Sequence, residues 1–113
     1  SSVALHIDVG DVALGVDSAI PCGLIINELI SNALKYAFPN YRQGELIVRL
    51  QEIEPRKFNL QVEDDGIGFP QDLDFRNTHS LGMQLVQSLS QQIGGTIELD
   101  RSHGTKFTIR FSL

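Results

Sequence analysis

Polar side chains recur at helical spacing within the segment 27–39, which reads NELISNALKYAFP. One stripe of a predicted helix carries Glu28, Asn32, Lys35 and Tyr36, because residues three or four positions apart are neighbours on a helical surface, and Ser31 lies beside it. The amide oxygen of Asn32 suits Mg²⁺, which prefers oxygen ligands, and Lys35 is one turn further on, within reach of a phosphate. Glu28 could orient a metal-bound water or act as a general base. The stripe predicts a magnesium-nucleotide site, with a plain amphipathic helix as the alternative.

A second candidate group, VEDDGIGFP at residues 62–70, follows a strand-like alternation. Asp64 continues the apolar row of that strand, whereas Asp65 points to the opposite face. A carboxylate at the end of an apolar row needs a hydrogen-bond donor, and the exocyclic amine of adenine supplies one where guanine presents a carbonyl. Gly66 and Gly68 would let the backbone approach a flat base closely. The segment predicts adenine recognition, and a glycine-rich turn without a ligand is the alternative.

Hydrophobic patterns predict the elements that must position these residues. Two short strands are expected at residues 5–9 and 12–16. A helix capped by Asp17 or Ser18 then runs to about Phe38. The remaining patterns predict strands at 46–51, 58–63, 96–100 and 105–113 and a helix at 81–93. We therefore expect an α+β fold, a two-layer α/β sandwich in which helices cover one face of a mixed, mostly antiparallel sheet.

The helical wheel also divides the first helix into a buried and a polar side. Leu24 and Ile25 fall on the polar side, which predicts a groove there rather than open water. The residues expected to pack on the sheet share the opposite arc: Cys22, Gly23, Ile26, Leu29, Ile30, Ala33, Leu34 and Ala37.

Size, charge and cysteine content narrow the functional classes. The 113 residues suit one domain, 1–113, and the immediate strand-like start suggests a piece of a longer protein. The formal net charge of −5, without a Lys/Arg cluster, argues against nucleic acid as a partner. Cys22 is the only cysteine, which excludes an intrachain disulfide and favours a reducing, cytoplasmic compartment. No apolar run approaches the ~18 residues of a membrane span, so we expect no membrane contact by this domain, although the full-length protein could be membrane-anchored.

The order of four motifs along the chain is more specific than any one of them. NELISNALKY, DDGIGF, SLGMQLV and GTKF resemble the N box and the three glycine boxes of the GHKL ATP-binding superfamily, over nearly the whole chain. The residues of these motifs are most similar to those of the catalytic, ATP-binding domain of sensor histidine kinases. The resemblance implies a Bergerat-type fold that binds Mg-ATP and donates the γ-phosphoryl group to a histidine. That histidine would lie on a separate helical dimerisation domain, and a response regulator would act downstream.

The resemblance also implies roles for the residues around the phosphates. Asn32 would ligate Mg²⁺, Lys35 would contact phosphate, and Tyr36 would pack beside the nucleotide. Leu81 and Gly82 would begin the helix whose backbone N–H groups face the phosphates. Tyr36 stands where related sequences usually carry histidine, and the second glycine box has only one glycine, Gly82.

The resemblance also implies roles for the residues expected to contact adenine and for a lid over the nucleotide. Asp64 would hold the adenine amine, Gly66 and Gly68 would shape the pocket, and Thr105 would assist Asp64 directly or through a water. Residues 69–80 would form the ATP lid, in which Phe75 is only a weak match to the phenylalanine box of the family.

Three other functions share parts of this pattern. An anti-sigma-factor-type serine kinase has the same boxes but phosphorylates a protein serine. An ATP-hydrolysing clamp of the chaperone type has a longer lid and further domains. A non-catalytic domain that senses nucleotide or docks a partner would not need Asn32, Lys35 and Asp64 together.

Overall fold

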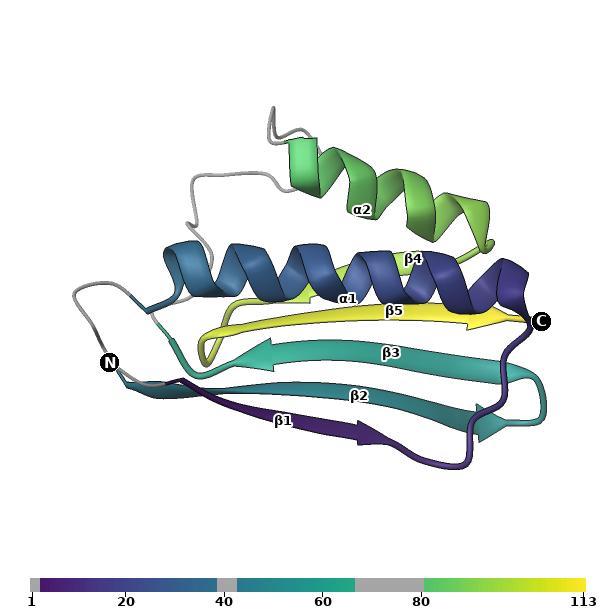
Figure 1. Ribbon diagram of the computed structural model, residues 1–113, viewed down its shortest axis with the longest axis horizontal. Coiled ribbons are helices and arrows are strands. Elements are labelled where there is room, and N and C mark those ends of the chain that lie inside the picture. Colours follow the sequence, from purple (N-terminus) through teal and green to yellow (C-terminus); the bar gives the residue numbers. More distant parts are fainter. Residues whose placement is uncertain (1–2, 39–42, 67–80) are drawn as a thin grey trace.

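The computed structural model describes residues 3–38, 43–66 and 81–113 and shows the predicted two-layer arrangement. Its elements are β1 (Val3–Val9), α1 (Val16–Tyr36), β2 (Gly44–Glu54), β3 (Lys57–Asp64), α2 (Leu81–Gln92), β4 (Thr96–Asp100) and β5 (Thr105–Ser112). The strands form one five-stranded sheet in the order β1-β2-β3-β5-β4, and both helices lie on the same face (Figure 1). Only the β1–β2 pair is parallel, so the prediction of a mixed, mostly antiparallel sheet is confirmed.

The hydrophobic core lies between the sheet and the helices. The alternating apolar residues of the three central strands are all buried: Leu46, Val48, Leu50, Phe58, Leu60, Val62, Phe107, Ile109 and Phe111. The registers place Val48 opposite Val62 and Leu60 opposite Ile109, so these residues share the helix-covered face. The face assignment made from period-two alternation is therefore confirmed for these strands.

The buried face of α1 is rotated from the one that the helical wheel predicts. Ile25, expected on the polar side, is fully buried, whereas Leu34, expected on the sheet, is 53% exposed and Gly23 is also exposed. Cys22 and Leu29 are buried as predicted, together with Ala33 and Ala37. The reason is that α1 packs against α2 as well as against the sheet, so its buried arc extends toward α2 and its opposite flank stays uncovered.

The predicted strand at 12–16 is wrong. Val12 and Leu14 lie in an irregular segment and pack on the core as partly buried residues, so their alternation reflects burial without strand pairing. The helix begins at Val16 with Gly15 as N-cap, and the carbonyl of Gly15 accepts the N–H groups of Ser18 and Ala19. The expected cap residues therefore lie in the first turn. Neither α1 nor α2, the helices in the described ranges, is long and apolar enough to cross a membrane.

Candidate functional site

The predicted adenine acceptor lies at one end of the sheet, where β3 ends and β5 begins. Asp64 is the last residue of β3 and stands directly opposite Thr105, the first residue of β5. Both side chains are buried, and directly opposed residues on one face have Cβ atoms about 5 Å apart. The structure thus brings a buried carboxylate and a buried hydroxyl together.

A backbone N–H group orients the carboxylate of Asp64. Its Oδ1 accepts a hydrogen bond from the N–H of Gly66, with a donor–acceptor distance of 2.9 Å. The exposed neighbour Asp65 faces the other way, and its Oδ1 accepts the N–H of Glu45 at 2.8 Å. A charge-assisted bond from a backbone N–H fixes the direction of a carboxylate. Asp64 is therefore oriented within the buried layer, while Asp65 ties the end of β3 to the start of β2.

The polar stripe of α1 meets the first turn of α2. The Nδ2 group of Asn32 donates a hydrogen bond to the Sδ atom of Met83, and the two atoms are 3.0 Å apart. Asn32 and Glu28 are half-buried, and Lys35 is exposed in the last turn of α1. Gly82 is half-buried next to Met83. The amide of Asn32 thus lies beside the helix start that the resemblance assigns to phosphate.

Three parts of the predicted site cannot be placed. The side chain of Tyr36, the residue Gly68 and the predicted lid at 69–80 lie outside the described residues.

The described residues fit a magnesium ion only when it is carried by a nucleotide. Among residues 3–38, 43–66 and 81–113, no group of three or more His, Cys, Asp or Glu side chains could hold a metal ion. Mg²⁺ bound to phosphates and waters needs only one or two protein oxygens, and the amide oxygen of Asn32 is of the right type.

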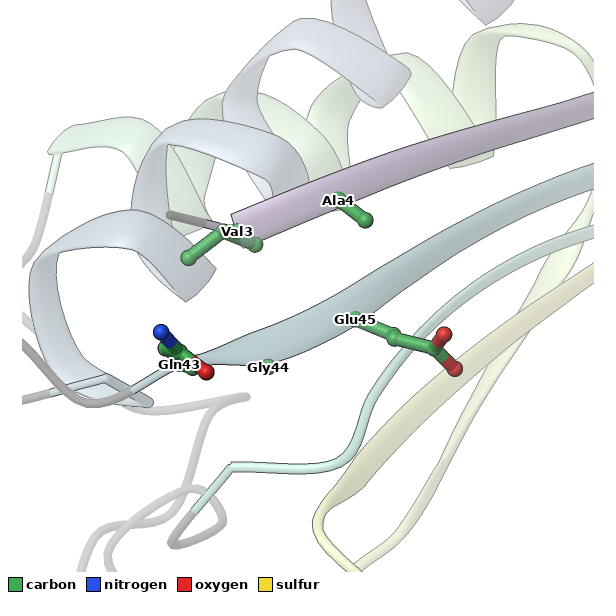
Figure 2. A pocket seen from close by; sticks show the side chains of 5 residues that line it. All are labelled: Val3, Ala4, Gln43, Gly44 and Glu45. Carbon is green, nitrogen blue, oxygen red and sulfur yellow. The ribbon is translucent and has the colours of Figure 1, made fainter. Parts of the chain in front are cut away.

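A hollow of about 420 Å³ opens near the starts of β1 and β2, lined by Val3, Ala4, Gln43, Gly44 and Glu45 (Figure 2). Among the described residues, Glu45 is the only ionisable one in its lining, and no described residue of the predicted site lines it. The described lining therefore does not connect this hollow with the predicted nucleotide site.

The free cysteine lies away from the polar groups of the site. Cys22 is buried in the core, and burial raises the pKa of its thiol, because a thiolate is disfavoured away from water. The thiol therefore stays neutral, as expected for a small apolar core residue.

Two glycines to which the sequence analysis gave no individual role pack tightly near the end of β3. Gly104 has φ +77° and sits so close to the Asp64 carbonyl oxygen that a Cβ would overlap it. A Cβ on Gly44 would overlap the ring of Phe38 and lie 2.7 Å from Oδ1 of Asp65. Gly104 belongs to the GTKF motif, which could have indicated it, whereas nothing local to the sequence marks Gly44. Both glycines position the strand ends that carry Asp64.

Gly44→Ala is expected to lower the free energy of unfolding by about 1–3 kcal/mol, because the added methyl group overpacks against Phe38. Urea denaturation measures the effect. The double variant Gly44→Ala/Phe38→Ala should lose less stability than the sum of the single variants, because the smaller side chain frees the space. Gly23→Ala is the control: a Cβ there meets no atom within 4 Å apart from its own helix backbone, and Ala favours a helix over Gly, so stability should not fall. A Gly44→Ala variant as stable as the parent would contradict the packing described here.

Comparison with known proteins agrees with the geometry. Residues 18–113 match the family model described as "Histidine kinase-, DNA gyrase B-, and HSP90-like ATPase", and the chain belongs to this family. Within it, the chain is an ATP-binding domain of the sensor histidine kinase type, as its four motifs predict.

Two curated relatives and two solved structures define the similarity. The chain is 30% identical over 100 residues to Blue-light-activated histidine kinase 2 of Erythrobacter litoralis, covering 88% of this chain and 29% of that protein. It is 34% identical over 107 residues to the sensor histidine kinase PdtaS of Mycobacterium tuberculosis, covering 90% of this chain and 21% of that protein. It spans less than a third of the length of either relative.

The first solved structure is the histidine kinase domain from Erythrobacter litoralis EL346 blue-light activated histidine kinase, with a TM-score of 0.91 and 30% identity over 98% of this chain and 52% of that one. The second, Acinetobacter baumannii histidine kinase AdeS, has a TM-score of 0.79 and 23% identity, covers 97% of this chain and 54% of that one, and supports the fold alone.

Proposed function

We propose that this domain binds Mg-ATP and donates the γ-phosphoryl group to a histidine on a separate helical dimerisation domain, from which a response regulator receives it. One observation supports the proposal most: the buried pair Asp64 and Thr105 lies at the end of the sheet where α1 ends and α2 begins (Figure 1). A cytoplasmic location belongs to the same proposal, because ATP and response regulators are found there.

The adenine ring is assigned to the end of β3. Asp64 would accept the exocyclic amine, with its orientation set by the N–H of Gly66, and the Thr105 hydroxyl would support it from β5. A buried carboxylate left facing the guanine carbonyl would lose its donor, which makes the site selective for ATP.

The phosphates are assigned to the surface where the polar stripe of α1 meets the first turn of α2. The amide oxygen of Asn32 would hold Mg²⁺, which neutralises phosphate charge during transfer, and Lys35 would contact a phosphate. Backbone N–H groups at Leu81 and Gly82, in the first turn of α2, would donate to the phosphates because the N-terminus of a helix favours anions. Glu28 would assist the incoming histidine or orient a metal-bound water.

The chain alone is expected not to phosphorylate itself. His6 lies on β1 and His103 in the turn between β4 and β5, whereas the γ-phosphate is assigned to the place where α1 meets the first turn of α2. His79 lies outside the described residues. Phosphoryl transfer needs an acceptor fixed in line with the bond that breaks, and such a residue must come from the separate domain.

Radiolabelled ATP tests this expectation. Acid-labile label should appear only on an added histidine-bearing domain and should be absent when its acceptor histidine is replaced by glutamine. Acid-stable label on a protein serine would favour the anti-sigma type of kinase instead. Rapid phosphate release by the chain alone would contradict the proposal.

A further inference from the structure

The two edges of the sheet are protected to different extents. At one edge, β4 has five residues, and its apolar side chains Ile97 and Leu99 are partly covered by the core. At the other edge, β1 has seven residues, and Leu5, Ile7 and Val9 are 50%, 63% and 46% exposed. Large apolar side chains in a row on an edge strand mark a surface that pairs with another strand.

The exposed apolar row of β1 continues the buried face of the sheet. The register sets Leu5, Ile7 and Val9 beside three buried residues of β2: Leu46, Val48 and Leu50. Figure 1 shows β1 as the strand farthest from α2, at the margin of the layer that α1 covers. Helix α1 packs over β2 and β3, and α2 packs over β4. The side chains of β1 on this face are therefore less covered than those of β2.

The backbone of β1 is suited to strand addition. All seven residues pair with β2 in an unbroken parallel register, without the bulge that irregular edges use for protection. In the sheet of the described residues, no strand lies on the other side of β1. Its sequence, VALHIDV, contains no proline or lysine to discourage pairing.

The sequence of β1 is complementary to itself in one antiparallel register. When two copies pair about Ile7, Leu5 lies opposite the partner's Val9, and Ile7 lies opposite the partner's Ile7. On the other face, His6 lies opposite the partner's Asp8, twice by symmetry. Pairing about His6 or Asp8 instead would oppose two imidazoles or two carboxylates, and like charges directly opposite are unfavourable.

Residues of β2 support this charge pattern. His6 also lies 3.6 Å from Glu45, measured from Nε2 to Oε1. Asp8 stands beside Arg49 in the register, and the Arg49 guanidinium is itself paired with Glu63 at 3.0 Å. In the dimer, His6 would have a carboxylate from each copy: Glu45 of its own chain and Asp8 of the other.

We propose that β1 is an interface between two copies of this chain, which pair antiparallel about Ile7. The two five-stranded sheets then form one continuous sheet. Directly opposed residues of antiparallel strands point to the same face, so the helices of both copies lie on one side of this sheet. Asp64 lies on β3, two strands away from this edge, so pairing does not require nucleotide.

Sedimentation equilibrium over a range of concentrations tests the interface. The chain should form dimers, and Ile7→Lys should weaken self-association at least about tenfold, because it places two lysine side chains opposite each other. Leu85→Lys is the matched control, since Leu85 is 37% exposed and lies on α2, the helix farthest from β1 in Figure 1. A monomer at every concentration, or a dimer lost only with Leu85→Lys, would overturn the proposal.

Cross-linking tests the register without adding charge. In a Cys22→Ala background, Ile7→Cys should form an interchain disulfide on mild oxidation, because directly opposed strand residues have Cα atoms within disulfide range. Leu5→Cys should not, since position 5 faces the partner's position 9. Cross-linking at position 5 alone would overturn the register. A chain that stays monomeric and binds a histidine-bearing domain through β1 would assign this edge to that domain instead.

Discussion

Asp64→Asn is expected to lower the affinity of this domain for ATP about 10- to 100-fold while leaving the fold intact. The asparagine oxygen can still accept the N–H of Gly66, but its amide would face the adenine amine, and two opposed donors lose a buried hydrogen bond worth about 1–3 kcal/mol. Calorimetry with ATP and GTP measures the change. The parent chain should strongly prefer ATP, and the variant should lose most of that preference.

Asp65→Asn is the matched control for this experiment. Asp65 is the exposed neighbour of Asp64, and an asparagine oxygen can accept the same N–H of Glu45 that its carboxylate accepts. ATP affinity should therefore stay close to that of the parent chain. Equal affinities of the parent for ATP and GTP would rule out Asp64 as the adenine acceptor, and a larger loss in Asp65→Asn than in Asp64→Asn would reverse the face assignment.

Asn32→Ala is expected to remove most of the Mg²⁺ dependence of nucleotide binding. Loss of groups that support a bound metal typically weakens it 10- to 100-fold, and we expect a change of about this size for the proposed ligand. Titration of ATP with and without Mg²⁺ measures it. Asn27→Ala should behave like the parent chain, because Asn27 is exposed and lies about 100° from Glu28 around the helix axis.

A second variant separates the metal role of Asn32 from its contact with α2. Met83→Leu removes the sulfur that accepts the Asn32 N–H but keeps a side chain of similar volume. Its Mg²⁺ dependence should be retained if the Asn32 oxygen binds the ion directly. If Met83→Leu loses the dependence as fully as Asn32→Ala, the contact between α1 and α2 is what matters. If Asn27→Ala loses it, the predicted phase of the polar stripe is wrong.

Local patterns in the sequence determined much of the fold and the family. Alternation along 58–63 identified the buried row that ends at Asp64, because strand side chains alternate between two faces whatever lies beyond them. The order of four short motifs identified the family, because each motif alone has low specificity, whereas the four in this order are specific. The residues proposed for adenine and magnesium all come from these local patterns.

Only the tertiary structure decided features that depend on distant neighbours. The buried arc of α1 includes Ile25 and excludes Leu34 because α2 covers one flank of the helix, and a helical wheel contains no information about a second covering element. Gly44 is restricted by Phe38 and Asp65, which approach it from other segments. The exposure of the apolar row in β1 follows from its place at the sheet edge, which pairing with β2 sets. Burial is a property of the assembled layers, so residues with the same local pattern end in the core or at the surface according to what packs beside them.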